Sequence, residues 1–278
     1  MLVVVKGSVW RVERKDAFMI GDRRTPIEKE WDAIRKKELK YLNSRSNKKD
    51  SFLNRKLEEK VPEKLQTTLD TAFCKAFELI FEKGTGIIEK TYKREEAEKN
   101  YQINEFTSQI KQDRKSLKAF SKKAKGSGSV NLLLSGASGV GMGVLGIGLP
   151  DIPLFTGMVL KGIYEIALSY GYSYESEQER YFILTLIQGA LSYGDELIDI
   201  NQRLNEYMRT GKLPDCYDRA QQIKDTAGTL SKELLYMKFL QGIPVVGAVG
   251  GFYDAIYMKQ IVEYANLKYQ YRFLREKL

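Results

Sequence analysis

The sequence predicts an all-α fold, a multi-helix bundle with glycine-rich apolar helices and a small N-terminal extension. Three observations support this fold class. Apolar residues recur with helical spacing along most of the chain, helix start signals precede several of these stripes, and no strand pattern follows residue 25. With 278 residues, of which 43% are hydrophobic, the chain is long and apolar enough to bury a large core.

The N-terminal extension, residues 1–60, is basic and the least regular part of the predicted fold. Its first twenty residues are rich in β-branched side chains in loose alternation, so we expect a short strand or hairpin there. The run Thr25–Glu28 (TPIE) is a capping box with proline at the first helical position, which predicts a helix as far as about Leu42. A polar, basic linker follows at residues 43–50.

The main helical domain is expected at residues 61–278. Its first helix opens at Val61-Pro62-Glu63 and carries an apolar stripe as far as Ile80. A single long, charged helix with a sparse apolar line is expected next, over residues 87–124. Glycine and proline then separate five further helices, at about residues 152–171, 173–193, 196–208, 215–240 and 243–278.

Residues 126–160 are the most unusual segment, because no charged residue occurs from Gly126 to Pro150 and eight glycines lie in that stretch. Glycine disfavours a helix by about 1 kcal/mol relative to alanine, so this density indicates close backbone packing or a non-helical path. Two interpretations remain open at this point. The segment either packs in the core against a second glycine-bearing segment, or forms a hairpin that inserts into a membrane interface. The close-packing interpretation rests on four glycines, Gly139, Gly143, Gly247 and Gly251.

Residue composition excludes several classes of chemistry. Histidine is absent, which rules out histidine-based triads and imidazole metal sites. Cys74 and Cys216 have no ligand-like spacing and fit a reducing compartment. We therefore predict no catalytic residue, no metal and no cofactor, and we do not expect an enzyme.

Positive charge is concentrated in the first half of the chain. Residues 1–125 carry 31 lysines and arginines against 20 acidic residues, whereas residues 126–278 carry 14 against 16. Interleaved lysine and glutamate are typical of solvated helix faces, but a basic half also suits anionic lipid headgroups. Nucleic acid is not expected as a partner, because no recognition motif accompanies the charge.

Two functional interpretations follow from these features. The first is a peripheral membrane or membrane-protein-associated factor that touches lipid or a partner through apolar side chains of the glycine segment: Val144, Leu145, Ile147, Leu149, Leu154 and Phe155. The alternative is a small-molecule binder or enzyme with a pocket bordered by charges that interrupt or flank the apolar segments: Asp151, Lys161, Glu165 and Asp254. The oligomeric state is left open.

Three segments, in this order, resemble the EcsC family. They are TAFCKAFELIFEKGTGIIEKTY, then LGIGLPDIPLFTGMVLKGIYEIALSYGY with ESEQERYFIL after it, and GIPVVGAVGGFYDAIYMKQIVEYANLKYQYRFL. The resemblance runs from about Val61 to Leu274 and implies an α-helical fold without an established enzymatic activity. That family is named for a bacterial gene beside an ABC transporter, which implies proximity to a membrane and a transporter subunit as a second kind of partner. No family catalytic residue can be carried over.

The expected location is the bacterial cytoplasm, with peripheral attachment at the inner face of the cell membrane. The apolar run before Lys6 is too short for the core of a signal peptide. No uncharged stretch is both long enough and helical enough to be assigned as a transmembrane helix.

Overall fold

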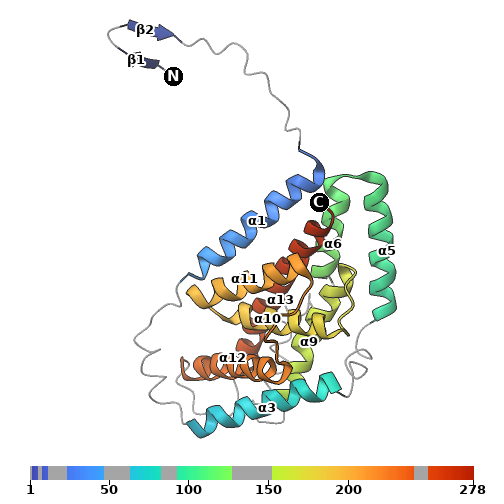
Figure 1. Ribbon diagram of the computed structural model, residues 1–278, viewed down its shortest axis with the longest axis vertical. Coiled ribbons are helices and arrows are strands. Elements are labelled where there is room, and N and C mark those ends of the chain that lie inside the picture. Colours follow the sequence, from blue (N-terminus) through green and yellow to red (C-terminus); the bar gives the residue numbers. More distant parts are fainter. Residues whose placement is uncertain are drawn as a thin grey trace.

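A computed structural model of the chain describes residues 2–5, 8–11, 24–46, 63–82, 93–126, 152–240 and 250–278. Within these residues the main body is a bundle of helices, so the all-α fold class is confirmed (Figure 1). Near the N-terminus, β1 (Leu2–Val5) and β2 (Ser8–Arg11) pair as a short antiparallel hairpin.

The bundle is organised around its C-terminal helix, α13 (Gly250–Glu276). This helix packs against α1 (Pro26–Ser44), α9 (Ile152–Ser169) and α10 (Glu177–Leu191). Between residues 261 and 274 of α13 the single exposed residue is Glu263. A helix buried on nearly every side belongs to the interior of a protein, and α13 occupies that position here.

The remaining C-terminal helices and α3 surround this centre. The helix α11 (Gly194–Thr210) packs on α10, and α12 (Arg219–Leu240) packs on both α10 and α3 (Glu63–Glu82). The predicted stripe of α3 is buried, with four side chains in the core: Phe73, Ala76, Phe77 and Phe81. Its other flank packs on α9, so α3 buries its apolar side against two helices.

One long helix had been expected where the structure has two, α5 (Arg94–Lys111) and α6 (Arg114–Gly126), so that prediction is wrong. The chain turns at Gln112, which adopts a left-handed backbone conformation with φ of 44°. Asp113 then caps α6, because its carboxylate accepts a hydrogen bond of 2.7 Å from the backbone N–H of Ser116. The turn folds α6 back against α5 and lets it reach α1 (Figure 1).

The capping box predicted for α1 is confirmed. The backbone N–H of Glu28 donates to Thr25 Oγ1 at 3.3 Å, and the backbone N–H of Thr25 donates to Glu28 Oε2 at 2.6 Å. Local side-chain chemistry therefore sets this helix start, as the sequence indicated. No described helix combines the length and apolarity needed to cross a bilayer.

Two cations of α13 lie inside the bundle, each beside a carboxylate from another helix. Lys268 has a fully buried side chain and pairs with Glu38 of α1. Arg272 pairs with Glu179 of α10 at 2.8 Å, and Glu179 also accepts a hydrogen bond of 2.6 Å from the Tyr269 hydroxyl. Buried charges of this kind persist only when paired and hydrogen-bonded, so these contacts dictate how α1 and α10 dock on α13.

Gly189 of α10 lies so close to α13 that a side chain there would meet Tyr264. A Cβ atom placed there would lie 2.8 Å from Cε1 of Tyr264 and 3.0 Å from Cγ2 of Ile200. Tyr264 is fully buried and stacks on Tyr41 with ring centroids 4.7 Å apart, so it has little room to move. The close approach predicted for Gly139, Gly143 and Gly247 concerns residues outside those described.

We expect Gly189→Ala to destabilise the protein by about 1–3 kcal/mol, because the added methyl group overpacks the α10–α13 contact. The matched control is Gly228→Ala in α12, where nothing lies within 4 Å of the new Cβ. That control should be neutral or stabilising by about 0.4–1 kcal/mol. Urea unfolding of both variants measures the difference, and equal midpoints would contradict the close approach.

Lys268 should make the stability of the protein depend on pH. Burial, only partly offset by Glu38, lowers the pKa of Lys268 from 10.5 to about 8. Between these values the unfolded chain binds more protons than the folded chain, so the free energy of unfolding rises with pH. The free energy of unfolding of wild type, relative to that of Lys268→Met, should therefore increase from about pH 8 to about pH 10.

Unfolding in urea at a series of pH values measures this trend. Lys259→Met is the matched control, because it removes an exposed lysine of the same helix and should leave the pH dependence unchanged. If the difference in free energy of unfolding between wild type and Lys268→Met stays constant across this range, the lowered pKa is contradicted.

Candidate functional site

Half of the predicted pocket can be placed in the structure. Lys161 and Glu165 lie one turn apart on α9, where Lys161 is half-buried and Glu165 is buried. Asp151 and the side chain of Asp254 lie outside the described residues, so the assembly of the four charges into one pocket stays a prediction.

The predicted lipid-contact residues lie mostly outside those described. These are Val144, Leu145, Ile147, Leu149 and the side chain of Leu154. Phe155 is the exception, and it is 6% exposed, with its ring 6.2 Å from the ring of Phe73 in an edge-on contact. This side chain therefore contributes to the core between α9 and α3.

The described residues contain no candidate metal centre. Among them, no group of three histidine, cysteine, aspartate or glutamate side chains lies close enough to hold a metal ion. Cys74 is half-buried, and burial raises the pKa of its thiol, which disfavours the reactive thiolate at neutral pH.

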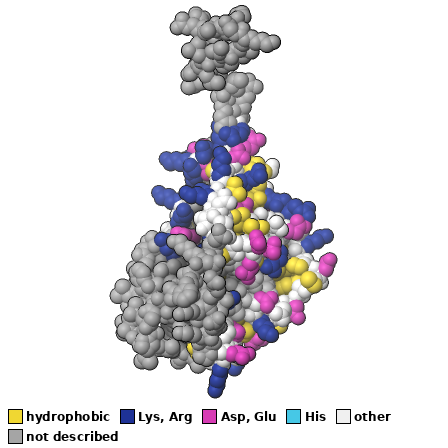
Figure 2. All heavy atoms as spheres, turned by 90° about the vertical axis from the view of Figure 1, so that its left-hand side faces the viewer, with side chains coloured by type: hydrophobic (Ala, Val, Ile, Leu, Met, Phe, Trp, Pro, Cys, Tyr) yellow, Lys and Arg dark blue, Asp and Glu magenta, His cyan; other side chains and the backbone are white. Residues whose placement is uncertain are grey.

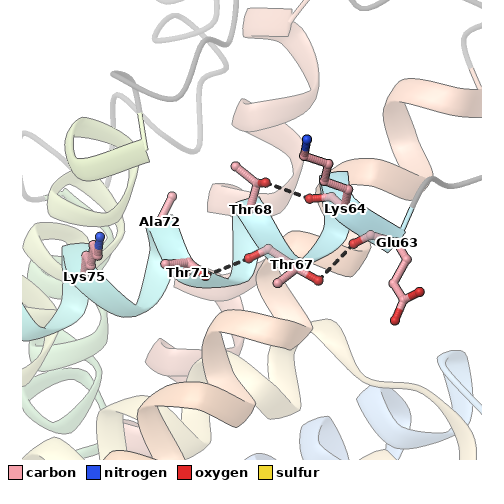
Figure 3. A pocket seen from close by; sticks show the side chains of 7 residues that line it. All are labelled: Glu63, Lys64, Thr67, Thr68, Thr71, Ala72 and Lys75. Carbon is pink, nitrogen blue, oxygen red and sulfur yellow. Dashed lines mark hydrogen bonds between the residues drawn. The ribbon is translucent and has the colours of Figure 1, made fainter.

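A groove of about 660 Å³ runs along α3, lined by Glu63, Lys64, Thr67, Thr68, Thr71, Ala72 and Lys75 (Figure 3). The three threonine hydroxyls donate to carbonyl oxygens of their own helix, at distances between 2.6 and 2.9 Å. Each lining side chain is exposed or half-exposed, so a ligand there would stay largely in water. Ligand pockets usually bury most of the ligand surface, and this groove does not have that form.

The helices α1 and α6 together form a basic face on the described surface. We define the basic face by five side chains: Lys37, Arg114, Lys118, Lys122 and Lys125. The four α6 residues are spaced i, i+4, i+8 and i+11, which aligns them on one side of the helix. Figure 2 views the molecule from the side of α1 and shows lysine and arginine side chains gathered over the upper part of the described surface.

One buried carboxylate anchors this face. Glu30 of α1 is 4% exposed, and it pairs with Arg114 Nε at 2.6 Å and with Lys118 Nζ at 3.7 Å. The two cations are themselves 46% and 58% exposed, so they link α6 to α1 while still meeting solvent. Glu30 thus pairs with two of the five cations that define the basic face.

The lysines of this face repel one another. The pKa of Lys37 is lowered by desolvation first and by Lys125 next, against the attraction of Glu30, and Lys118 lowers it further. Lys37 and Lys125 come from different helices and are brought together by the packing of α1 on α6. A surface that holds like charges close together favours an anionic partner, which would relieve the repulsion.

Sequence reasoning predicted a basic N-terminal half without identifying these residues. The i, i+4, i+8, i+11 spacing of cations from Arg114 to Lys125 was a readable signal for one basic helix side. The contribution of Lys37 carried no such signal, because it depends on a contact between distant segments.

Comparison with known proteins gives a consistent family assignment. The model of the EcsC protein family matches residues 27–274. The chain is also 26% identical over 240 residues to Protein EcsC of Bacillus subtilis (strain 168), an alignment that covers 82% of this chain and 90% of that protein. No solved structure matches the chain.

The family match begins earlier in the chain than the resemblance noted from sequence, which started at about residue 61. It includes α1, the helix that contributes Glu30, Lys37 and Glu38 to the contacts described above. Because the match spans residues 27–274 of 278, the chain belongs to the EcsC protein family.

Proposed function

We propose that the protein is a non-enzymatic factor that attaches peripherally to the cytoplasmic side of a membrane and binds anionic lipid headgroups through the basic face. The observation that carries this proposal is the clustering of Lys37, Lys118 and Lys125, whose mutual repulsion is only partly balanced by Glu30. Phosphate groups of a lipid surface would supply the missing negative charge.

The distribution of exposed cations suits a flat, anionic partner. Lys37, Lys122 and Lys125 are exposed, and each Lys near an anionic surface contributes about 1 kcal/mol of attraction. Exposed charges are screened over about 8 Å at physiological ionic strength, so attachment through this face should be reversible and weakened by salt.

The test is cosedimentation with vesicles of phosphatidylglycerol and phosphatidylcholine, compared with vesicles of phosphatidylcholine alone. Wild type should pellet with the anionic vesicles at low salt and be released at high salt. The triple variant Lys37→Gln/Lys122→Gln/Lys125→Gln should bind the anionic vesicles about a hundredfold more weakly, because it loses about 3 kcal/mol of attraction.

The matched control is Lys212→Gln/Lys224→Gln/Lys232→Gln, which removes the same charge from exposed positions in the C-terminal half of the chain. It should retain most of the binding. If both triple variants lost the same amount of binding to anionic vesicles, the attraction would depend on net charge alone. Wild type that fails to pellet with anionic vesicles at low salt would refute the proposal and point to a protein partner, such as a transporter subunit.

A further inference from the structure

The outer face of α5 exposes an aligned stripe of large apolar side chains. Ile103, Phe106 and Ile110 are 63%, 65% and 65% exposed, and their i, i+3, i+7 spacing places them in one row. Tyr101 and Ser108 lie on the opposite side of the helix, which faces the bundle. Single exposed apolar residues are ordinary, but three in a row on one helix are typical of a contact surface.

Alongside the stripe, between residues 102 and 112, no acidic side chain is exposed. Between residues 102 and 112 the other exposed side chains are Gln102, Gln109, Lys111 and Gln112. The one acidic residue of that span, Glu105, turns inward and accepts a hydrogen bond of 2.7 Å from Lys277 Nζ. The stripe is therefore bordered by neutral amides and a cation.

Charges of both signs lie at the ends of the stripe, because Lys99 pairs with Glu95 at 4.0 Å and the exposed Asp113 precedes Arg114. Lys99 precedes Ile103 by one helical turn, and Arg114 and Lys115 begin α6 directly after the turn that follows Ile110. All three are exposed. The stripe is thus an apolar row bordered by neutral amides and Lys111, with lysine and arginine side chains within one turn of each end that could reach lipid phosphates.

The helix that carries the stripe is a neighbour of the helix that carries most of the basic face. The helix α6 packs against both α5 and α1, and Figure 1 shows α5 at the outer edge of the molecule beside α6. Arg114 belongs to the basic face and lies four residues beyond Ile110. Attraction through the basic face would therefore bring this end of α5 close to the same surface.

We infer that α5 inserts its stripe of Ile103, Phe106 and Ile110 into the boundary between headgroups and acyl chains of an anionic membrane. This inference rests on the proposed function and names the element that enters the lipid. Lys99, Lys111 and Lys115 would extend their aliphatic stems beside the stripe and direct their ammonium groups to lipid phosphates.

Insertion can be measured with a tryptophan placed in the stripe. In Phe106→Trp, bound to phosphatidylglycerol vesicles with brominated acyl chains, we expect a loss of tryptophan emission beyond that of wild type, together with a blue shift. Ile198→Trp is the matched control, because Ile198 is an apolar residue of α11 that is 42% exposed and lies away from the stripe. Its added tryptophan should not be quenched.

Affinity gives a second readout. Ile103→Gln/Phe106→Gln/Ile110→Gln should bind anionic vesicles at least about tenfold more weakly than wild type, because three apolar side chains no longer leave water. Ile198→Gln should bind as wild type does. All four substitutions replace exposed side chains, and urea unfolding checks that each variant remains folded.

The outcomes separate this inference from the proposed function. Wild type could bind anionic vesicles while Phe106→Trp shows no quenching and the triple glutamine variant binds fully. That result would overturn the insertion of α5 and leave the proposed function standing. Failure of wild type to bind would overturn both. Self-association of wild type that the triple glutamine variant abolishes, with vesicle binding unchanged, would assign the stripe to contact between copies and overturn the inference.

Discussion

The arrangement of this bundle depends on keeping two cations of its central helix neutralised inside the protein. The Lys268 side chain is fully buried and that of Arg272 is 16% exposed. Each requires a carboxylate from another helix, supplied by Glu38 of α1 and Glu179 of α10. Removal of one partner from a buried pair leaves an uncompensated charge, which costs about 3–5 kcal/mol. The pairs therefore specify which helices dock on α13 and at which level along it.

Aromatic side chains complete these two sites. The Arg272 guanidinium lies 4.0 Å from the centre of the Tyr172 ring, and the Tyr269 hydroxyl donates to the same carboxylate that Arg272 contacts. Lys268 Nζ also donates to Asn205 Oδ1 of α11 at 2.8 Å. Buried polar groups are tolerated when their hydrogen-bonding capacity is used, and here the donors and acceptors come from four different helices.

The outer surface follows from this inner arrangement. Docking of α1 through Glu38 brings Glu30 to the position where it pairs with Arg114, and this pair joins α6 to the bundle. Lys37 and Lys125 then become neighbours although they lie far apart in the sequence. The basic face is thus a product of helix packing, and its charge cannot be attributed to either helix alone. Family membership describes the fold, whereas the function must be argued from surfaces such as this one.

The sequence alone determined the helical character of the chain, the start of α1 and the excess of positive charge in the first half. These properties are local, since a capping box and an apolar period depend on residues within a few turns of one another. The break between α5 and α6 was not predicted, because the left-handed residue there is Gln112 and no glycine or proline marks the turn in the sequence. Apolar periodicity likewise placed Tyr101 and Phe106 on one helix without deciding which would be buried.

The tertiary structure decided those questions. Tyr101 lies against Phe120 of α6, with ring centroids 5.8 Å apart, and this contact turns Phe106 towards solvent. The position of Lys37 beside Lys125 was decided in the same way, by contact between helices far apart in the chain. A single helix can present apolar or charged residues on more than one side, and the side that is buried depends on which neighbour packs there.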